Sequence, residues 1–122
     1  KGDTSYTARI GRGRAMAPAY VYDQKYAPII AERLTQGNST INGLLWADMQ
    51  KMNFDCKTKL KNFKNPVLVI QGKEDIISNE IGEIANKTFP NSKLILLEHS
   101  KHYGWLDARE KYFLEINSFL KS

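Results

Sequence analysis

Residues 65–75 read NPVLVIQGKED, and this stretch decides the fold class. Residues 67–70 are an uninterrupted apolar run, which Gln71 and Gly72 bring to an end. Continuous apolar character, without alternating polar residues, is typical of a strand that is covered on both faces in a parallel sheet. The stretch therefore predicts a buried strand that delivers a polar loop, residues 72–75, to one edge of a sheet.

The chain then continues with the pattern of a helix, a second strand and a last helix. Ser78 is a suitable N-cap for a helix whose apolar residues recur at helical spacing from Ile81. Residues 94–97 read LILL and predict a second buried strand. Asp107 and Glu110 have the spacing of a capping box at the start of the last helix. This order predicts an α/β fold in which helices flank two parallel strands with open edges.

The first half of the chain lacks strand-like runs and divides into two segments. Residues 1–19 contain three glycines and Pro18 among small and basic residues, so we expect an irregular N-terminal segment. Residues 20–53 are expected to be helical, with Pro28 kinking a first helix or starting its second part. Ser39 or Thr40 is expected to cap the next helix. That helix carries a stripe that is either core packing or a cap over a pocket: Ile41, Leu44, Leu45, Trp46, Met49 and Met52.

Length and composition exclude several classes of protein. The 122 residues allow one domain or a piece of one, and 42% hydrophobic with 25% charged residues is ordinary globular composition. Cys56 is the single cysteine, which rules out an internal disulfide. No apolar run approaches the roughly 20 residues that span a bilayer, and residues 1–7 lack the apolar centre of a signal peptide. We expect no membrane partner; the compartment stays open, with the cytoplasm slightly favoured.

The net charge of +5 is spread over two basic groups. One comprises Arg9, Arg12 and Arg14, and the other lies within residues 57–64. A solvated basic face explains such groups more simply than a groove for a polyanion, so no nucleic-acid partner is expected. The two histidines and the cysteine do not have zinc-ligand spacing, and we expect neither a metal nor another cofactor.

Two polar loops follow the predicted strands, and both would lie at the same edge of the sheet. In parallel α/β sheets, ligand sites lie beyond the carboxyl ends of the strands. The first loop offers Glu74 and Asp75, and the second offers His99 and His102. A carboxylate that accepts the imidazole Nδ1–H fixes the tautomer of the ring and stabilises its protonated form. The order acid, then histidine, is that of the α/β-hydrolase triad.

The same loops carry a resemblance to the α/β-hydrolase superfamily. Residues 65–75 resemble its "PVLVIxGxxD" stretch, residues 94–106 its histidine loop and residues 112–120 its last helix. Residues 20–52 resemble the helical lid of proline-iminopeptidase-like members. The resemblance implies a helical lid over residues 20–53, followed by the C-terminal portion of the hydrolase fold over residues 54–122.

The resemblance also assigns the candidate site residues. It implies that Asp75 is the triad acid, since the Gly-x-x-Asp spacing favours it over Glu74, and that His102 is the triad base. His99 lies too near the strand end. The family usually has glycine directly before the histidine, whereas this chain has Lys101, which alters the backbone freedom of the loop.

The nucleophile of such a triad is missing from this sequence. The family places it in Gly-x-Ser-x-Gly at a turn between strand and helix. The nearest string, Gly37-Asn38-Ser39-Thr40-Ile41, lacks the final glycine and follows a helical segment. We therefore interpret Ser39 as a helix cap and Cys56 as a small packed side chain.

Two functions remain open at this stage. The first is a C-terminal fragment of a serine hydrolase, inactive alone, whose full-length form acts on a peptide or another small molecule. The proline-iminopeptidase resemblance implies release of an N-terminal residue from peptides. The alternative is a non-catalytic interaction module that binds a partner or forms a homodimer through its exposed strand edges.

Overall fold

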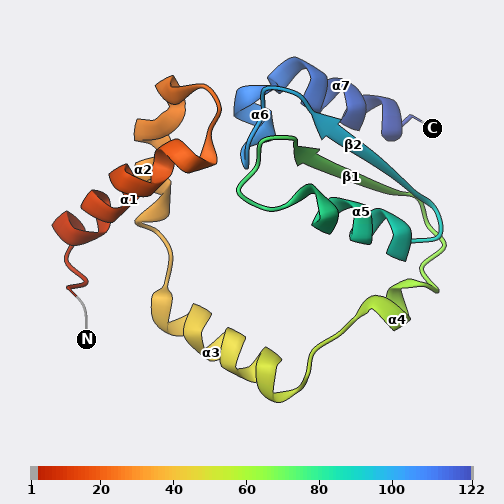
Figure 1. Ribbon diagram of the computed structural model, residues 1–122, viewed down its shortest axis with the longest axis horizontal. Helices are drawn as coiled ribbons and strands as arrows, with labels where there is room; N and C mark the ends of the chain where they lie inside the picture. Colours follow the sequence, from red (N-terminus) through yellow and green to blue (C-terminus); the bar gives the residue numbers. More distant parts are fainter. Residues whose placement is uncertain (1–2, 122) are drawn as a thin grey trace.

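The computed structural model describes residues 3–121 as a small α/β unit with helical extensions (Figure 1). Its elements, in chain order, are α1 (Tyr6–Tyr20), the 3₁₀ turn η1 (Gln24–Tyr26), α2 (Ala27–Leu34), α3 (Ser39–Lys51), α4 (Lys57–Leu60), β1 (Val67–Gly72), α5 (Asn79–Thr88), β2 (Ser92–Leu97), α6 (Gly104–Asp107) and α7 (Arg109–Phe119). The α/β pattern predicted for the second half of the chain is confirmed.

The two strands form a parallel pair that aligns the following loops. Val67 pairs with Ser92, and Gly72 pairs with Leu97, so both strands end level with each other. Helix α5 packs on one side of the pair and α7 on the other (Figure 1). The strand residues before Gly72 are only half-buried, because no third strand joins the sheet within residues 3–121. The sequence prediction of fully covered strands is therefore met only in part.

The expectation of an irregular segment over residues 1–19 is wrong for residues 6–19, while residues 1–2 lie outside the described residues. Residues 6–20 form α1, which begins where the Ser5 Oγ accepts a hydrogen bond from Ala8 N at 3.2 Å. Gly13 acts as a contact point here: a Cβ on it would lie 2.5 Å from the carbonyl oxygen of Ala31. Gly13 thus lets α1 and α2 pack closely, and the tertiary contact outweighs the low helix propensity of glycine.

Helix starts were predicted correctly at one position and wrongly at two. Ser78 caps α5 as expected, accepting a hydrogen bond from Glu80 N. Asn38, instead of Ser39 or Thr40, caps α3, and its Oδ1 accepts from Thr40 N and Ile41 N at 3.1 Å each. Asp107 does not cap the last helix: it ends α6, and α7 follows Ala108 without a side-chain cap. The Asp107 carboxylate is used elsewhere, as described below.

A small hydrophobic core joins α1 and α2 to the loop after β2. Its buried side chains are Ile10, Ala17, Val21, Ile30, Ala31 and Tyr103. Tyr103 belongs to the histidine loop, so the N-terminal helices and that loop share one core. Pro28 lies in the first turn of α2, which confirms that it starts the second part of this helical segment.

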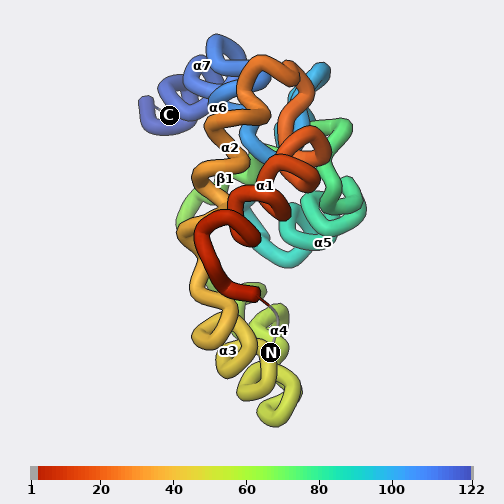
Figure 2. Tube along the Cα trace, turned by 90° about the vertical axis from the view of Figure 1, so that its left-hand side faces the viewer, coloured from red at the N-terminus to blue at the C-terminus, as the bar shows by residue number. Residues whose placement is uncertain are grey.

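Helix α3 lies apart from the sheet in both views of the chain (Figures 1 and 2). Its apolar stripe is largely solvent-exposed: Ile41, Leu44 and Trp46 each expose more than 60% of their surface. The interpretation of this stripe as core packing is therefore wrong within the described residues. No helix within residues 3–121 has the length and apolarity required to cross a bilayer.

Candidate functional site

The candidate site forms where the loops after β1 and β2 meet. Lys73 N donates to Leu97 O at 2.9 Å, and Glu74 N donates to Ser100 O at 3.0 Å, so the two loops leave the sheet side by side. The contact requires glycine at the end of β1, because a Cβ on Gly72 would lie 2.1 Å from Lys101 O. The aligned strand ends and this close approach bring the acidic loop against the histidine loop.

Asp75 and His102 contact each other, as the sequence predicted. His102 Nδ1 lies 3.1 Å from Asp75 Oδ1 and 3.2 Å from Oδ2. The side chain of Asp75 is 7% exposed and that of His102 is 42% exposed. Ile77 N also donates to Asp75 Oδ1 at 3.1 Å, which holds the carboxylate in place. With its proton on Nδ1 the ring donates to the carboxylate, and Nε2 is then the nitrogen that can accept a proton.

The structure separates the rival residues from this pair. The Glu74 carboxylate accepts from the backbone N–H of the buried Ser100 at 3.1 Å, so it joins the two loops. The His99 ring packs against Tyr22 with 5.2 Å between centroids, and its φ of 52° is in the left-handed region. Among the described residues, Asp75 with His102 is the one acid–histidine pair in contact, which is the pair that the family resemblance implied.

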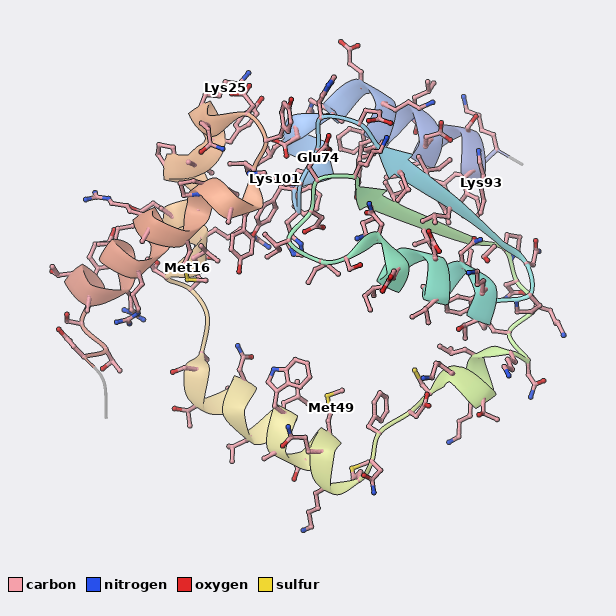
Figure 3. The ribbon with its side chains drawn as sticks, viewed as in Figure 1. Met16, Lys25, Met49, Glu74, Lys93 and Lys101 are labelled. Carbon is pink, nitrogen blue, oxygen red and sulfur yellow. The ribbon has the colours of Figure 1, made fainter. Side chains whose placement is uncertain are left out.

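Lys101, the departure from the family pattern, reaches toward the N-terminal helices. Its Nζ donates to Pro18 O at 2.9 Å, and Figure 3 shows Lys101 beside Glu74 where the two loops meet α1. His102 N donates to Tyr20 O at 3.0 Å, and the Tyr20 ring lies edge-on to the imidazole at 5.5 Å. The end of α1 is therefore part of the surroundings of His102.

Asp107 is a residue of this site that the sequence reasoning missed. Its Oδ2 accepts from Tyr22 N and Lys101 N, each at 2.9 Å, and its Oδ1 accepts from Asp23 N at 3.1 Å. Two of these donors lie more than 80 residues away in sequence. A local pattern could therefore only suggest the capping role, and no signal in the single sequence points to these contacts.

One ionic contact modifies the acidic loop. Lys73 Nζ lies 2.7 Å from Glu98 Oε1, and this hydrogen bond raises the pKa of the Lys73 ammonium above its usual value. The pair is solvent-exposed, and exposed ion pairs contribute little to stability. It therefore adds a cationic and an anionic group to the rim of the loops without fixing their geometry.

Ser39 and Cys56, the two residues considered as nucleophiles, lie away from the Asp75–His102 pair. Ser39 is the first residue of α3, and it lines an open hollow with residues of α1 such as Arg9 and Met16, whereas neither Asp75 nor His102 lines that hollow. Cys56 directly precedes α4 and is half-buried. Neither residue is hydrogen-bonded to His102 in the described chain, which agrees with their rejection as nucleophiles, although Asn38 and not Ser39 caps α3.

Sequence comparison finds relatives that share one name. No family model matches the chain. The proline iminopeptidase of Heyndrickxia coagulans is 31% identical over 91 residues, covering 70% of this chain and 32% of that protein. The proline iminopeptidase of Clostridium botulinum is 31% identical over 68 residues, covering 56% of this chain and 23% of that protein. The chain thus spans about a third or less of the length of the curated relatives it matches.

Structural comparison places nearly the whole chain on known folds. The 2-hydroxy-6-oxo-6-phenylhexa-2,4-dienoate hydrolase of Rhodococcus superposes with a TM-score of 0.71 at 16% identity, covering 98% of this chain and 47% of that one. The bromoperoxidase of Bacillus anthracis gives a TM-score of 0.71 at 19% identity, covering 93% of this chain and 44% of that one. The chain therefore has the fold of part of an α/β-hydrolase, with the loops of the sheet presenting an acid and a histidine. Within that class its sequence is proline iminopeptidase-like, as the sequence resemblance indicated.

Proposed function

We propose that this chain is the lid and C-terminal portion of a proline iminopeptidase-like serine hydrolase, with Asp75 as triad acid and His102 as triad base. The contact between His102 Nδ1 and Asp75 Oδ1 at 3.1 Å carries this proposal. Such a contact points Nε2 away from the carboxylate, which is the arrangement a general base needs. In this proposal α1 and the segment over residues 20–53 form the lid.

The proposed reaction is acyl transfer through a serine. Nε2 of His102 takes the proton of the serine hydroxyl while the serine oxygen forms a bond to the carbonyl carbon of the scissile amide. The buried Asp75 carboxylate stabilises the imidazolium. The imidazolium then gives the proton to the leaving nitrogen as the C–N bond breaks, and water hydrolyses the acyl-enzyme by the same steps in reverse.

The serine in this scheme comes from polypeptide outside the 122 residues. The sequence contains no Gly-x-Ser-x-Gly, and Ser39 lies in the cap region of α3. An acid and a base without a nucleophile do not form an acyl-enzyme. The chain by itself is therefore proposed to be inactive.

The proposed substrates are short peptides that lose their N-terminal residue, with proline as the first residue to test. This step is supported by the names of the curated relatives, which are proline iminopeptidases at 30–31% identity. The α/β-hydrolase fold alone does not supply it, because the same fold serves many reactions.

A hybrid enzyme tests the proposal. Residues 1–122 are joined behind the preceding part of the Heyndrickxia coagulans proline iminopeptidase, in place of its matching portion. We expect the hybrid to hydrolyse L-prolyl-4-nitroanilide and the isolated chain to be inert. His102→Ala and Asp75→Ala should lower kcat/KM of the hybrid by about 10³-fold or more.

Matched controls are available in the same loops and helices. His99→Ala and Ser39→Ala should leave the hybrid active, since neither residue is hydrogen-bonded to the pair. Hydrolysis by the isolated chain that disappears with Ser39→Ala would overturn the proposal. So would a hybrid whose rate is unchanged by His102→Ala.

One observation favours the alternative, a self-associating module. Both strands have an outer edge without a strand partner in residues 3–121, and α5 and α7 expose apolar side chains such as Ile81 and Leu114. Unpaired edges and exposed apolar faces promote pairing between chains. Sedimentation equilibrium distinguishes the cases. A dimer that is dissociated by Leu114→Lys, or by a substitution to proline in β1, supports the module. A chain that stays monomeric at high micromolar concentration contradicts it.

A further inference from the structure

The Asp107 carboxylate lies where three parts of the chain meet. It accepts one backbone N–H from the histidine loop, at Lys101, and two from the segment after α1, at Tyr22 and Asp23. Hydrogen bonds from N–H groups to a carboxylate are stronger than those between neutral groups. From these contacts we infer that Asp107 is a positioning residue, which fixes the His102 loop and ties it to the N-terminal helices.

The bond to Lys101 acts on the histidine through the backbone. Lys101 N donates to Asp107, and the next amide, His102 N, donates to Tyr20 O. The amides of two successive peptide units, on either side of the Lys101 Cα, are thus both held, which sets the direction in which the His102 side chain leaves the loop. This matters because the ring is 42% exposed, so packing alone does not fix its orientation toward Asp75.

The bonds to Tyr22 and Asp23 act on the helical segment. The backbone is extended at Val21, directly after α1, and the Val21 side chain is fully buried in the shared core. Lys101 Nζ adds a further link to Pro18 O in the last turn of α1. A shift of α1 relative to the sheet would therefore disturb the same carboxylate that holds the loop of the histidine. This inference rests on the proposed role of His102 as the base.

Asp107→Asn tests the inference with the smallest change of shape. Oδ2 accepts from both Tyr22 and Lys101, while Oδ1 accepts from Asp23. An amide has oxygen at only one of these positions, so its NH₂ group must face at least one backbone N–H. Glu110→Gln is the matched control: Glu110 lies three residues further on, is exposed and undergoes the same loss of charge.

The experiment is NMR on the ¹⁵N-labelled 122-residue chain, and it needs no catalytic activity. In Asp107→Asn, we expect an amide that faces the new NH₂ group to exchange about tenfold faster or more, and the other amides bound to residue 107 to exchange faster to a smaller extent, because they lose the charge of the carboxylate. We also expect the ¹⁵N signals of the His102 ring to shift as its contact with Asp75 changes. The exchange rates of the β1 and β2 amides should stay as in the wild type. In Glu110→Gln, the exchange rates of Tyr22, Asp23 and Lys101 and the His102 ring signals should also stay as in the wild type.

Two results would overturn the inference. One is an unchanged His102 ring signal in a folded Asp107→Asn variant, which would leave Asp107 without influence on the histidine. The other is faster exchange of every amide in the chain, which would mean a loss of general stability. An inactive hybrid enzyme affects neither result, so failure of the proposed function is distinguishable from failure here.

The wild-type chain provides a second measurement in case Asp107→Asn does not fold. One carboxylate accepts hydrogen bonds from all three N–H groups, so these hydrogen bonds should open together. The three amides should then show similar protection from exchange and a similar response to denaturant. Similar protection of Tyr22, Asp23 and Lys101 supports the link between the loop and the helices. Protection that differs widely between Lys101 and the other two contradicts it.

Discussion

A Cβ on Gly72 would lie 2.1 Å from the carbonyl oxygen of Lys101 and 2.4 Å from that of Ser100. The obstructing atoms belong to the backbone, so no side-chain rotation can make room for a methyl group. Gly72 is also the last residue of β1 and precedes Asp75 by three positions. The glycine is therefore a condition for the contact between the acidic loop and the histidine loop.

Gly72→Ala should disrupt the candidate site while the remaining helices still form. Forcing a methyl group against backbone costs about 1–3 kcal/mol, and it should push residues 100–102 away from Asp75. Urea unfolding measures the loss of stability, and the His102 ring signals in NMR report the lost contact. Gly43→Ala is the control, because a Cβ there meets nothing within 4 Å. Unchanged His102 signals in Gly72→Ala would contradict this view of the loop.

The two glycines of α1 should respond to alanine in opposite directions. A Cβ on Gly13 would lie 2.5 Å from Ala31 O, whereas one on Gly11 meets nothing within 4 Å. Gly13→Ala should separate α1 from α2 and destabilise the chain by about 1–3 kcal/mol. Gly11→Ala should stabilise it by about 0.5–1 kcal/mol through helix propensity. Thermal unfolding followed by circular dichroism checks both, and equal effects would argue against close packing of these helices.

The start of α3 depends on Asn38. Its Oδ1 accepts from Thr40 N and Ile41 N, so Asn38→Ala removes both hydrogen bonds and should weaken the helix start by about 1 kcal/mol. Ser39→Ala, one position further, should have little effect. Because α3 lies apart from the sheet, the readout is amide exchange within the first turn of α3. Faster exchange in Ser39→Ala than in Asn38→Ala would restore Ser39 as the cap.

Glu115 should make stability depend on pH on the acid side. Its carboxylate lies within 3.1 Å of both Lys111 Nζ and Lys93 Nζ, and these hydrogen bonds, that to Lys111 first, hold its pKa below the usual 4.5. The folded chain therefore binds this proton less readily than the unfolded chain. Glu115 thus stabilises the fold above pH 4.5, and this contribution is lost as the pH falls through the lowered pKa.

Urea unfolding at pH 7 and pH 3 measures this contribution. Glu115→Gln should lower the midpoint at pH 7 and lower it less at pH 3. Glu83→Gln is the control, because within residues 3–121 Glu83 forms an ion pair only with the exposed Lys87, at 3.6 Å. A variant that is equally destabilised at both pH values would show that Glu115 acts through packing and not through its charge.

Elements with a strong local signal could be predicted from the sequence. The apolar runs before Gly72 and around Leu94 gave the two parallel strands, and Ser78 gave the start of α5. The Asp75–His102 contact was also predicted, because level ends of parallel strands bring their loops together. For the strands and the helix start, the deciding information lies within about ten residues, whereas Asp75 and His102 lie 27 residues apart and were selected by the family resemblance.

Misjudged elements depended on contacts between distant residues. Gly13 indicates a loop locally, but it serves a helix contact with Ala31. Asp107 has the spacing of a cap, but its carboxylate binds amides that arrive from the other half of the chain. Helix propensity and capping are worth about 1 kcal/mol each, so a single tertiary contact is enough to override them.

The sequence by itself therefore determined the α/β class and the two strands, because apolar periodicity is a local property. Loop position placed acids and histidines at one edge of the sheet, and the resemblance to α/β-hydrolases selected Asp75 and His102 among them. Only the tertiary structure decided that residues 6–20 are helical, that α3 exposes its apolar stripe, and that Asp107 joins the histidine loop to α1. The reason is physical: close backbone approach, and N–H groups whose acceptor lies on a distant segment, arise only when distant segments meet.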